Sequence, residues 1–150
     1  MKKHLLVLFG LLLSPFLFSQ ILTVNSGSSV SIASGSSVTL GGLEIAPSDT
    51  YVISGANDIS RTTTAVTAGD NSSVSRVYNT TALLTDFTGT LTFSYLDVEL
   101  NNIAEGYLVL ELQASDGTWT SYTGTRDETN NTVSYTFNGR RYNYRNEQLI

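Results

Sequence analysis

Cysteine is absent from this chain of 150 residues, and lysine, histidine and methionine do not occur after residue 4. The lack of cysteine excludes disulfide bonds, so the stability of the fold has to come from packing. The lack of histidine and lysine excludes an imidazole base and a Schiff-base amine and, with the missing thiols, the usual zinc ligands. Only carboxylates are left for catalysis, and we expect that the protein is not an enzyme.

Positive charge is also scarce. Residues 20–150 hold six arginines against thirteen aspartates and glutamates, a balance of −7. Binding to nucleic acid or to an anionic membrane depends on a basic surface that releases counterions. We therefore expect no nucleic-acid partner.

The first 19 residues have the pattern of a secretory signal peptide. Met1–Lys3 is a positive start, Leu5–Leu13 is an apolar run, and the small residue Ser19 precedes Gln20. We predict cleavage between Ser19 and Gln20 by a Sec-type pathway; an uncleaved N-terminal anchor is the alternative. The apolar run is short for a membrane span and no second one follows. The expected product is secreted or lies at the cell surface, and is not an integral membrane protein after cleavage.

The remaining chain has the composition of an all-β protein. Residues 21–150 include 17 serines and 20 threonines, and they show no helical period. Two consecutive eight-residue repeats, SGSSVSIA at 26–33 and SGSSVTLG at 34–41, place pairs of apolar residues eight residues apart. The pairs are Leu22 and Val24, Val30 and Ile32, and Val38 and Leu40. Each repeat predicts a short strand and a turn. Stacked units would form a small β-solenoid or ladder; a meander packed on the next domain and a Ser/Gly linker are the alternatives.

Longer strands are predicted in the second half. Apolar residues alternate at Leu91, Phe93 and Tyr95, and their phase then flips to Leu96, which predicts a bulge or sharp bend. Asp116-Gly117 predicts a hairpin. The pattern favours an antiparallel β-sandwich. The predicted organisation is a signal peptide at 1–19, a Ser/Gly-rich β-repeat at 20–56, a β-sandwich at 57–138 and a basic tail at 139–150.

The predicted tail differs in composition from the rest of the chain, because it is rich in arginine and lacks serine and threonine. Arg140, Arg141 and Arg145 are half of the arginines in the chain. The tail is interpreted as a solvated basic segment or edge strand; a natural module interrupted by truncation and a docking tail are the alternatives.

Three stretches of the chain together carry a resemblance to a known class of proteins. They are SGSSVSIASGSSVTLGG at 26–42, the short Lys-Lys signal that ends in Phe-Ser-Gln, and SRVYNTTALLTDFTGTLTFSYLDVELN at 75–101. Together they resemble exported, repeat-containing, adhesin-like surface proteins of Bacteroidetes, many of them cargo of type IX secretion. The resemblance implies a surface stalk, an adhesin or a polymer-binding part.

Two groups of side chains are candidate sites. The densest oxygen cluster consists of Asp97, Glu99, Asn101, Asn102 and Glu105. It is interpreted as a solvated acidic bend or as a calcium site with Asp97, Glu99 and Asn101 as candidate ligands. No other cofactor is expected. Trp119, with Tyr122 and Tyr135, could form a stacking platform for sugar rings, although alternation also suits these aromatic residues to the core.

The sequence thus favours a non-catalytic structural or adhesive module. The alternatives are a carbohydrate-binding module and a fragment of a larger adhesin. The expected partner is a surface polysaccharide or another copy of a surface protein.

The predicted cleavage can be tested by mass. Protein recovered from the medium or cell envelope of an expressing bacterium should have the intact mass of residues 20–150, whereas a chain that lacks residues 2–19 should stay in the cytoplasm. A recovered product that retains residues 2–19 would contradict cleavage and favour the uncleaved anchor.

Overall fold

The computed structural model of the chain describes residues 19–68, 71–81, 86–114, 116–138 and 147–149. The predicted signal up to residue 18 and the arginines of the predicted tail lie outside these residues. The elements, in chain order, are β1 (Ser19–Val24), β2 (Ser29–Ile32), β3 (Val38–Leu40), β4 (Leu43–Pro47), β5 (Tyr51–Ser54), β6 (Asn57–Thr62), β7 (Thr67–Ala68), β8 (Asn71–Ser72), β9 (Val77–Thr80), β10 (Gly89–Ser94), η1 (Asp97–Glu99), η2 (Glu105–Tyr107), β11 (Leu110–Gln113), β12 (Trp119–Tyr122), β13 (Thr125–Asp127), β14 (Thr132–Phe137) and β15 (Glu147–Leu149).

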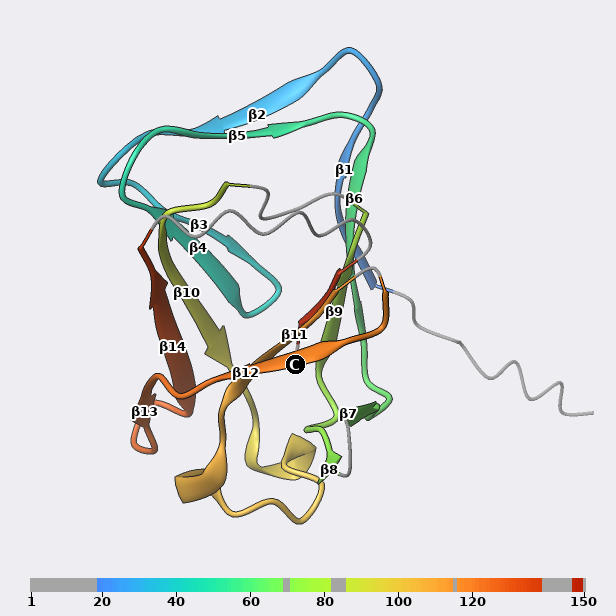
Figure 1. The fold of residues 1–150 in the computed structure, drawn as a ribbon, viewed down its shortest axis with the longest axis vertical. Coiled ribbons are helices and arrows are strands. Elements are labelled where there is room, and N and C mark those ends of the chain that lie inside the picture. The colour runs from blue at the N-terminus through green and yellow to red at the C-terminus, as the bar shows by residue number, and fades with distance from the viewer. Residues whose placement is uncertain (1–18, 69–70, 82–85, 115, 139–146, 150) are drawn as a thin grey trace, which may run out of the picture.

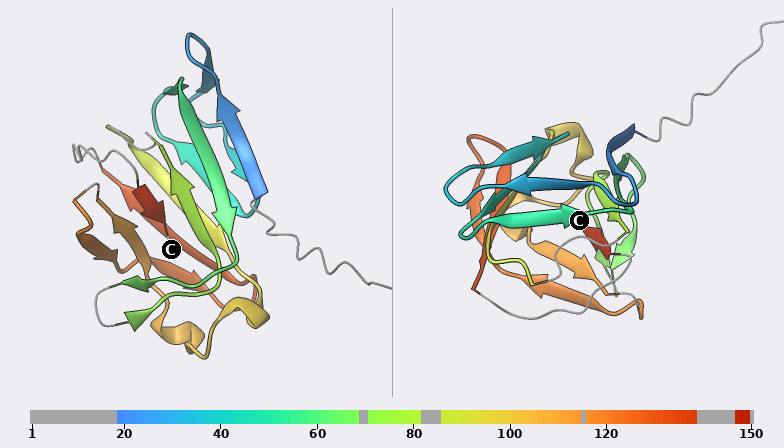
Figure 2. Two further views of the ribbon diagram at one scale, coloured as in Figure 1. Left: turned by 90° about the vertical axis from the view of Figure 1, so that its right-hand side faces the viewer. Right: turned by 90° about the horizontal axis from the view of Figure 1, so that it is seen from above.

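The strands form two large antiparallel sheets, which confirms the predicted all-β, sandwich-like fold. One sheet has the order β1-β6-β9-β15-β11-β12, and the other has the order β13-β14-β10-β4-β3. Two smaller ribbons pair β2 with β5 and β7 with β8. Figures 1 and 2 show the β2–β5 ribbon beyond one end of the two large sheets, and the 3-10 turns η1 and η2 at the opposite end. Within the described part of the chain, no helix is long and apolar enough to cross a membrane.

The strands of the eight-residue repeat do not stack on one another as a solenoid would require. β1 pairs with β6, β2 with β5 and β3 with β4. Each of these partner strands lies after residue 41, where the second repeat ends, so the strands of the repeat do not pair with one another. β4 also pairs with β10, so strands from both sides of the predicted boundary at residue 56 share a sheet. The regular pairs still mark a common environment. Val24, Ile32 and Leu40, the second members of the three pairs, are all buried in one core.

That core lies between the two large sheets. Burial alternates along β4 and along β10, as expected for strands with one face turned inward. Ile45 and Leu91 come from the five-stranded sheet, and Ile59, Tyr78 and Leu110 from the six-stranded sheet. All five side chains are almost completely buried. Burial of this apolar surface, which contributes about 25 cal/mol per Å², is therefore the main stabilising contribution to the fold.

Local turn signals predicted the later strands well. The Asp116-Gly117 hairpin joins β11 to β12, with Gln113 opposite Trp119, so this prediction is confirmed. The predicted phase flip after Tyr95 marks the end of a strand: β10 stops at Ser94 and the chain enters η1. The apolar residues beyond the flip do not continue into a strand: Val98 lies within η1 and is 89% exposed.

A backbone carbonyl in the β3–β4 turn connects the two large sheets. Gly41 and Gly42 form this turn with φ values of 58° and 102°, in the left-handed region that favours glycine. The carbonyl oxygen of Gly41 accepts hydrogen bonds from Arg61 Nη1 at 3.0 Å, Arg76 Nη1 at 2.9 Å and Tyr78 Oη at 2.8 Å. Because β6 and β9 hold Arg61 and Tyr78, this Gly41 junction fastens the five-stranded sheet to the six-stranded sheet.

Substitution of Gly42 should test the junction. A Cβ atom there would collide with Arg76 Nη1 and approach Tyr78 Oη to 3.0 Å, so Gly42→Ala should lower the free energy of unfolding by about 2–4 kcal/mol. Gly35→Ala is the matched control, since Gly35 also has a positive φ but meets no atom within 4 Å. It should cost only about 1 kcal/mol. Equal losses in urea denaturation would show that the junction contributes nothing beyond the backbone conformation.

Candidate functional site

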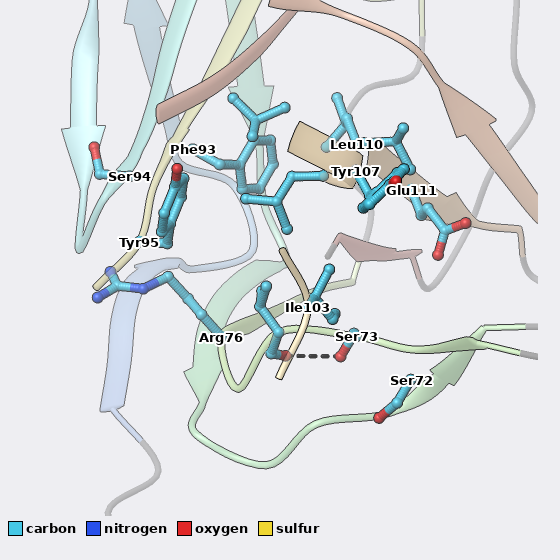
Figure 3. Close-up of a pocket in the computed structure, with 14 residues that line it drawn as sticks. Ser72, Ser73, Arg76, Phe93, Ser94, Tyr95, Ile103, Tyr107, Leu110 and Glu111 are labelled. Carbon is cyan, nitrogen blue, oxygen red and sulfur yellow. Dashed lines mark hydrogen bonds between the residues drawn. The ribbon is translucent and has the colours of Figure 1, made fainter. Parts of the chain in front are cut away.

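A pocket of about 490 Å³ opens at the end of the sandwich that carries η1 and η2. Its walls come from both large sheets: Phe93 from β10, Val133 from β14 and Leu110 from β11. The connections around β8, η1 and η2 complete it, with Ser73 and Ile103 among the residues that line it (Figure 3). A volume of this size is typical of sites that hold small molecules or anchoring side chains.

Two tyrosines in the pocket lining have opposite exposure. Tyr95 follows β10 and is 6% exposed, while Tyr107 ends η2 and is 82% exposed. A buried tyrosine hydroxyl needs a hydrogen-bond partner, and Tyr95 donates to Glu105 Oε1 at 2.9 Å. Tyr107 leaves most of its ring available to a ligand. It is therefore the aromatic residue of the pocket that is best placed to make a new contact.

The pocket lining includes one positively charged side chain, Arg76, and its charge is balanced by a carboxylate of the same chain. Arg76 forms a two-pronged ion pair with Glu99, with N···O distances of 2.8 Å and 3.0 Å. Burial disfavours the guanidinium charge, but the hydrogen bonds with Glu99 and Tyr78 outweigh that effect and hold the pKa of Arg76 above its ordinary value. The remaining N–H contact goes to Gly41. Arg76 thus fixes the rim of the pocket and has no unbalanced charge to offer an anionic ligand.

The hydroxyls in the pocket lining are largely used as well. Ser73 Oγ donates to the carbonyl of Val74 and accepts from the N–H of Val66. Ser72 Oγ accepts from Asn101 Nδ2 at 2.9 Å. With these groups satisfied, the pocket presents mainly apolar atoms to a ligand.

The oxygen cluster that the sequence singled out does not converge on one point. Glu99 binds Arg76, Asp97 Oδ1 accepts from Asn131 Nδ2 at 2.6 Å, and Asn101 donates to Ser72 and to the carbonyl of Ser73. Across the described ranges, no three acidic side chains are gathered in a way that could hold a metal ion. These three residues instead brace the η1 turn beside the pocket.

The predicted aromatic platform lies elsewhere in the fold. Tyr122 is 7% exposed, and its ring contacts those of Tyr135 and Phe137 at centroid distances of 4.9 Å and 5.2 Å. Tyr135 packs half-buried against the main core, and Trp119 packs against Val77. Tyr122 and Tyr135 thus belong to the main core and Trp119 to a smaller cluster around Val77, and the three rings do not form one exposed face.

The predicted cleavage residues begin the first strand. Ser19 pairs with Arg61 and Gln20 with Ser60 in the ladder between β1 and β6.

Residues of the pocket were not identified from the sequence, apart from a general expectation of core positions. One feature of the sequence points to Tyr107. It lies between Ile103 and Leu108, where the alternation of apolar residues that is typical of a buried strand is interrupted.

Comparison of the chain with protein-family models, with curated proteins and with solved structures finds no match. The physical properties of the pocket therefore have to support any functional proposal by themselves.

Tyr95 predicts a stability change at high pH. Burial, then the hydrogen bond to Glu105, and the nearby charges of Glu105, Glu128 and Asp97 raise its pKa from 10.0 to about 12. The folded state therefore holds more protons than the unfolded state between these pH values, and stability should fall as pH rises through this window. Urea unfolding at a series of pH values should show a smaller fall for Tyr95→Phe than for Tyr107→Phe. Identical pH profiles for the two variants would contradict the assignment.

Proposed function

We propose that this protein is a non-catalytic module, secreted or held at the cell surface, that attaches to a partner through the pocket at the η1 and η2 end of the sandwich. The observation that carries the proposal is the largely apolar pocket of about 490 Å³ with the ring of Tyr107 exposed at its rim. Exposed aromatic side chains beside a desolvated pocket are typical anchors of binding sites. The expected export of the chain favours an adhesive or structural role.

The carboxylates near the pocket support a binding role over a catalytic one. Glu99 is held by Arg76, and Glu105 accepts the hydroxyl of Tyr95. Glu111 accepts a hydrogen bond from Ser121 at 2.6 Å. Glycoside hydrolysis uses a pair of carboxylates that are available to the substrate, whereas each of these three carboxylates accepts a hydrogen bond from a side chain of the same chain.

Calcium has no part in this proposal. An ion bound by Asp97 and Glu99 would have to replace the contact of Asp97 with Asn131 and the ion pair of Glu99 with Arg76. Such an ion would compete with the contacts that Asp97 Oδ1 and both carboxylate oxygens of Glu99 make within the chain.

A carbohydrate-binding module is the second candidate. The exposed ring of Tyr107 favours it, because an exposed aromatic face can stack on the apolar face of a sugar ring. In this version Tyr107 takes the role that the sequence suggested for Trp119, and polysaccharide is the partner.

Attachment should depend on Tyr107. Bacteria that display the chain should adhere to at least one of several surfaces coated with cellulose, chitin, collagen or fibrinogen. Tyr107→Ala should reduce adhesion by about tenfold, because loss of a central aromatic anchor costs on the order of 1.4 kcal/mol or more. Val52→Ala is the matched control, since Val52 is a large apolar side chain with 48% exposure on β5, away from the pocket.

The two candidate functions give different patterns in this assay. Tyr107-dependent adhesion to cellulose or chitin alone would favour the carbohydrate-binding module. Absence of adhesion to every surface, or adhesion that is equally sensitive to Val52→Ala and Tyr107→Ala, would contradict the proposed function.

A further inference from the structure

We infer that the occupant of the pocket is a segment of a partner polypeptide in which an uncharged aromatic or aliphatic side chain is flanked by arginine or lysine. This inference rests on the proposed binding role of the same pocket. It is carried by the combination of an apolar interior, a negatively charged surround and exposed apolar residues next to the mouth.

The interior of the pocket selects an uncharged group. Phe93, Leu110 and Val133 contribute apolar walls, and Arg76 is neutralised by Glu99. An ionised group placed against these three walls would lose its hydration without gaining a partner from them, which is unfavourable. An aromatic or branched aliphatic side chain would gain from burial and could also contact the ring of Tyr107.

The surround of the pocket is acidic. Glu111 belongs to the lining itself, and the carboxylate of Glu128 lies close to η2, because a Cβ on Gly106 would be 3.7 Å from its Oε1. Glu105 accepts the hydrogen bond of Tyr95, and the charges of Glu105, Glu128 and Asp97 all act on that tyrosine. Arg126, whose Nη1 donates to the carbonyl of Leu108 at 3.0 Å, offsets one of these four charges. The remaining negative field attracts a cationic partner and repels an anionic one.

Apolar surface continues beyond the pocket on the same connection. Leu96 is 55% exposed and Val98 is 89% exposed, both at η1. With Tyr107, they are three of the four large apolar side chains that are exposed in the described part of the chain. An extended partner covers such a spread of residues better than a single small molecule does. A polysaccharide is less well matched, since the hydroxyls of Ser72 and Ser73 are already paired within the chain.

Short capped peptides can test the inference with the purified protein. Fluorescence anisotropy would compare Gly-Arg-Phe-Arg-Gly with Gly-Glu-Phe-Glu-Gly and Gly-Arg-Ser-Arg-Gly, and with soluble oligosaccharides of cellulose and chitin. We expect the first peptide to bind at least about tenfold more tightly than the other two, and its affinity to fall as salt rises from about 20 to about 500 mM.

Two variants and their controls locate the binding. Tyr107→Ala should weaken binding of the first peptide by about tenfold and Val52→Ala should not. Glu128→Gln should weaken it by about two- to fivefold at low salt. Asp49→Asn removes one charge beyond Pro47, which is opposite Gly89 at the start of β10 and thus at the far end of that strand from the pocket. It should have no effect.

Each other outcome overturns the inference. Equal binding of the arginine and glutamate peptides removes the role of charge, and equal binding of the phenylalanine and serine peptides removes the role of the pocket. Tyr107-dependent binding of an oligosaccharide alone, or Tyr107-dependent self-association of the chain, replaces the polypeptide partner but leaves the proposed binding role in place. Binding of no probe, by protein that still mediates Tyr107-dependent adhesion, contradicts only the identity of the partner.

Discussion

The three hydrogen bonds that meet at the carbonyl oxygen of Gly41 are the polar contact that links the two large sheets to the pocket. They fasten the β3–β4 turn to β6 and β9, so that the two large sheets are joined by polar contacts as well as by the core. The turn can present its carbonyl in this way because glycines occupy both left-handed positions. Since Arg76 also binds Glu99, the same contact extends to η1. It therefore sets the position of one side of the pocket.

The pocket lies where β10 ends, since Phe93, Ser94 and Tyr95 all line it. After Ser94 the chain makes two 3-10 turns before it re-enters a sheet at Leu110. Part of this connection turns inward, as the 7% exposure of Leu108 shows, and part stays outside, as Tyr107 does. Arg76, Tyr95, Ser72 and Ser73 in the pocket lining all have hydrogen-bond partners within the chain. A site with these properties has little chemistry to offer but has apolar surface and shape, which is why we favour attachment over catalysis.

Local patterns predicted local structure, and the long-range pairings could not be obtained from them. Alternating apolar residues and Asp116-Gly117 were sufficient for β11 and β12, because a hairpin depends on neighbouring residues. The eight-residue period suggested stacked rungs, whereas β1 pairs with β6 across more than thirty residues. Residue type suggested Trp119 as a sugar platform, but its exposure is decided by packing on Val77. The Gly41 junction could not be predicted, since a backbone carbonyl leaves no mark in a sequence.

We propose that this protein acts through the η1 and η2 end of the sandwich. This claim can be tested most directly by mapping backbone amide chemical shifts while the labelled protein is titrated with whichever coated polymer or peptide supports its attachment. We predict changes concentrated at residues 72–76, 93–111 and 133, with the largest near Tyr107. Changes concentrated instead around Trp119, Tyr122 and Tyr135, or along the β2–β5 ribbon, would contradict this claim.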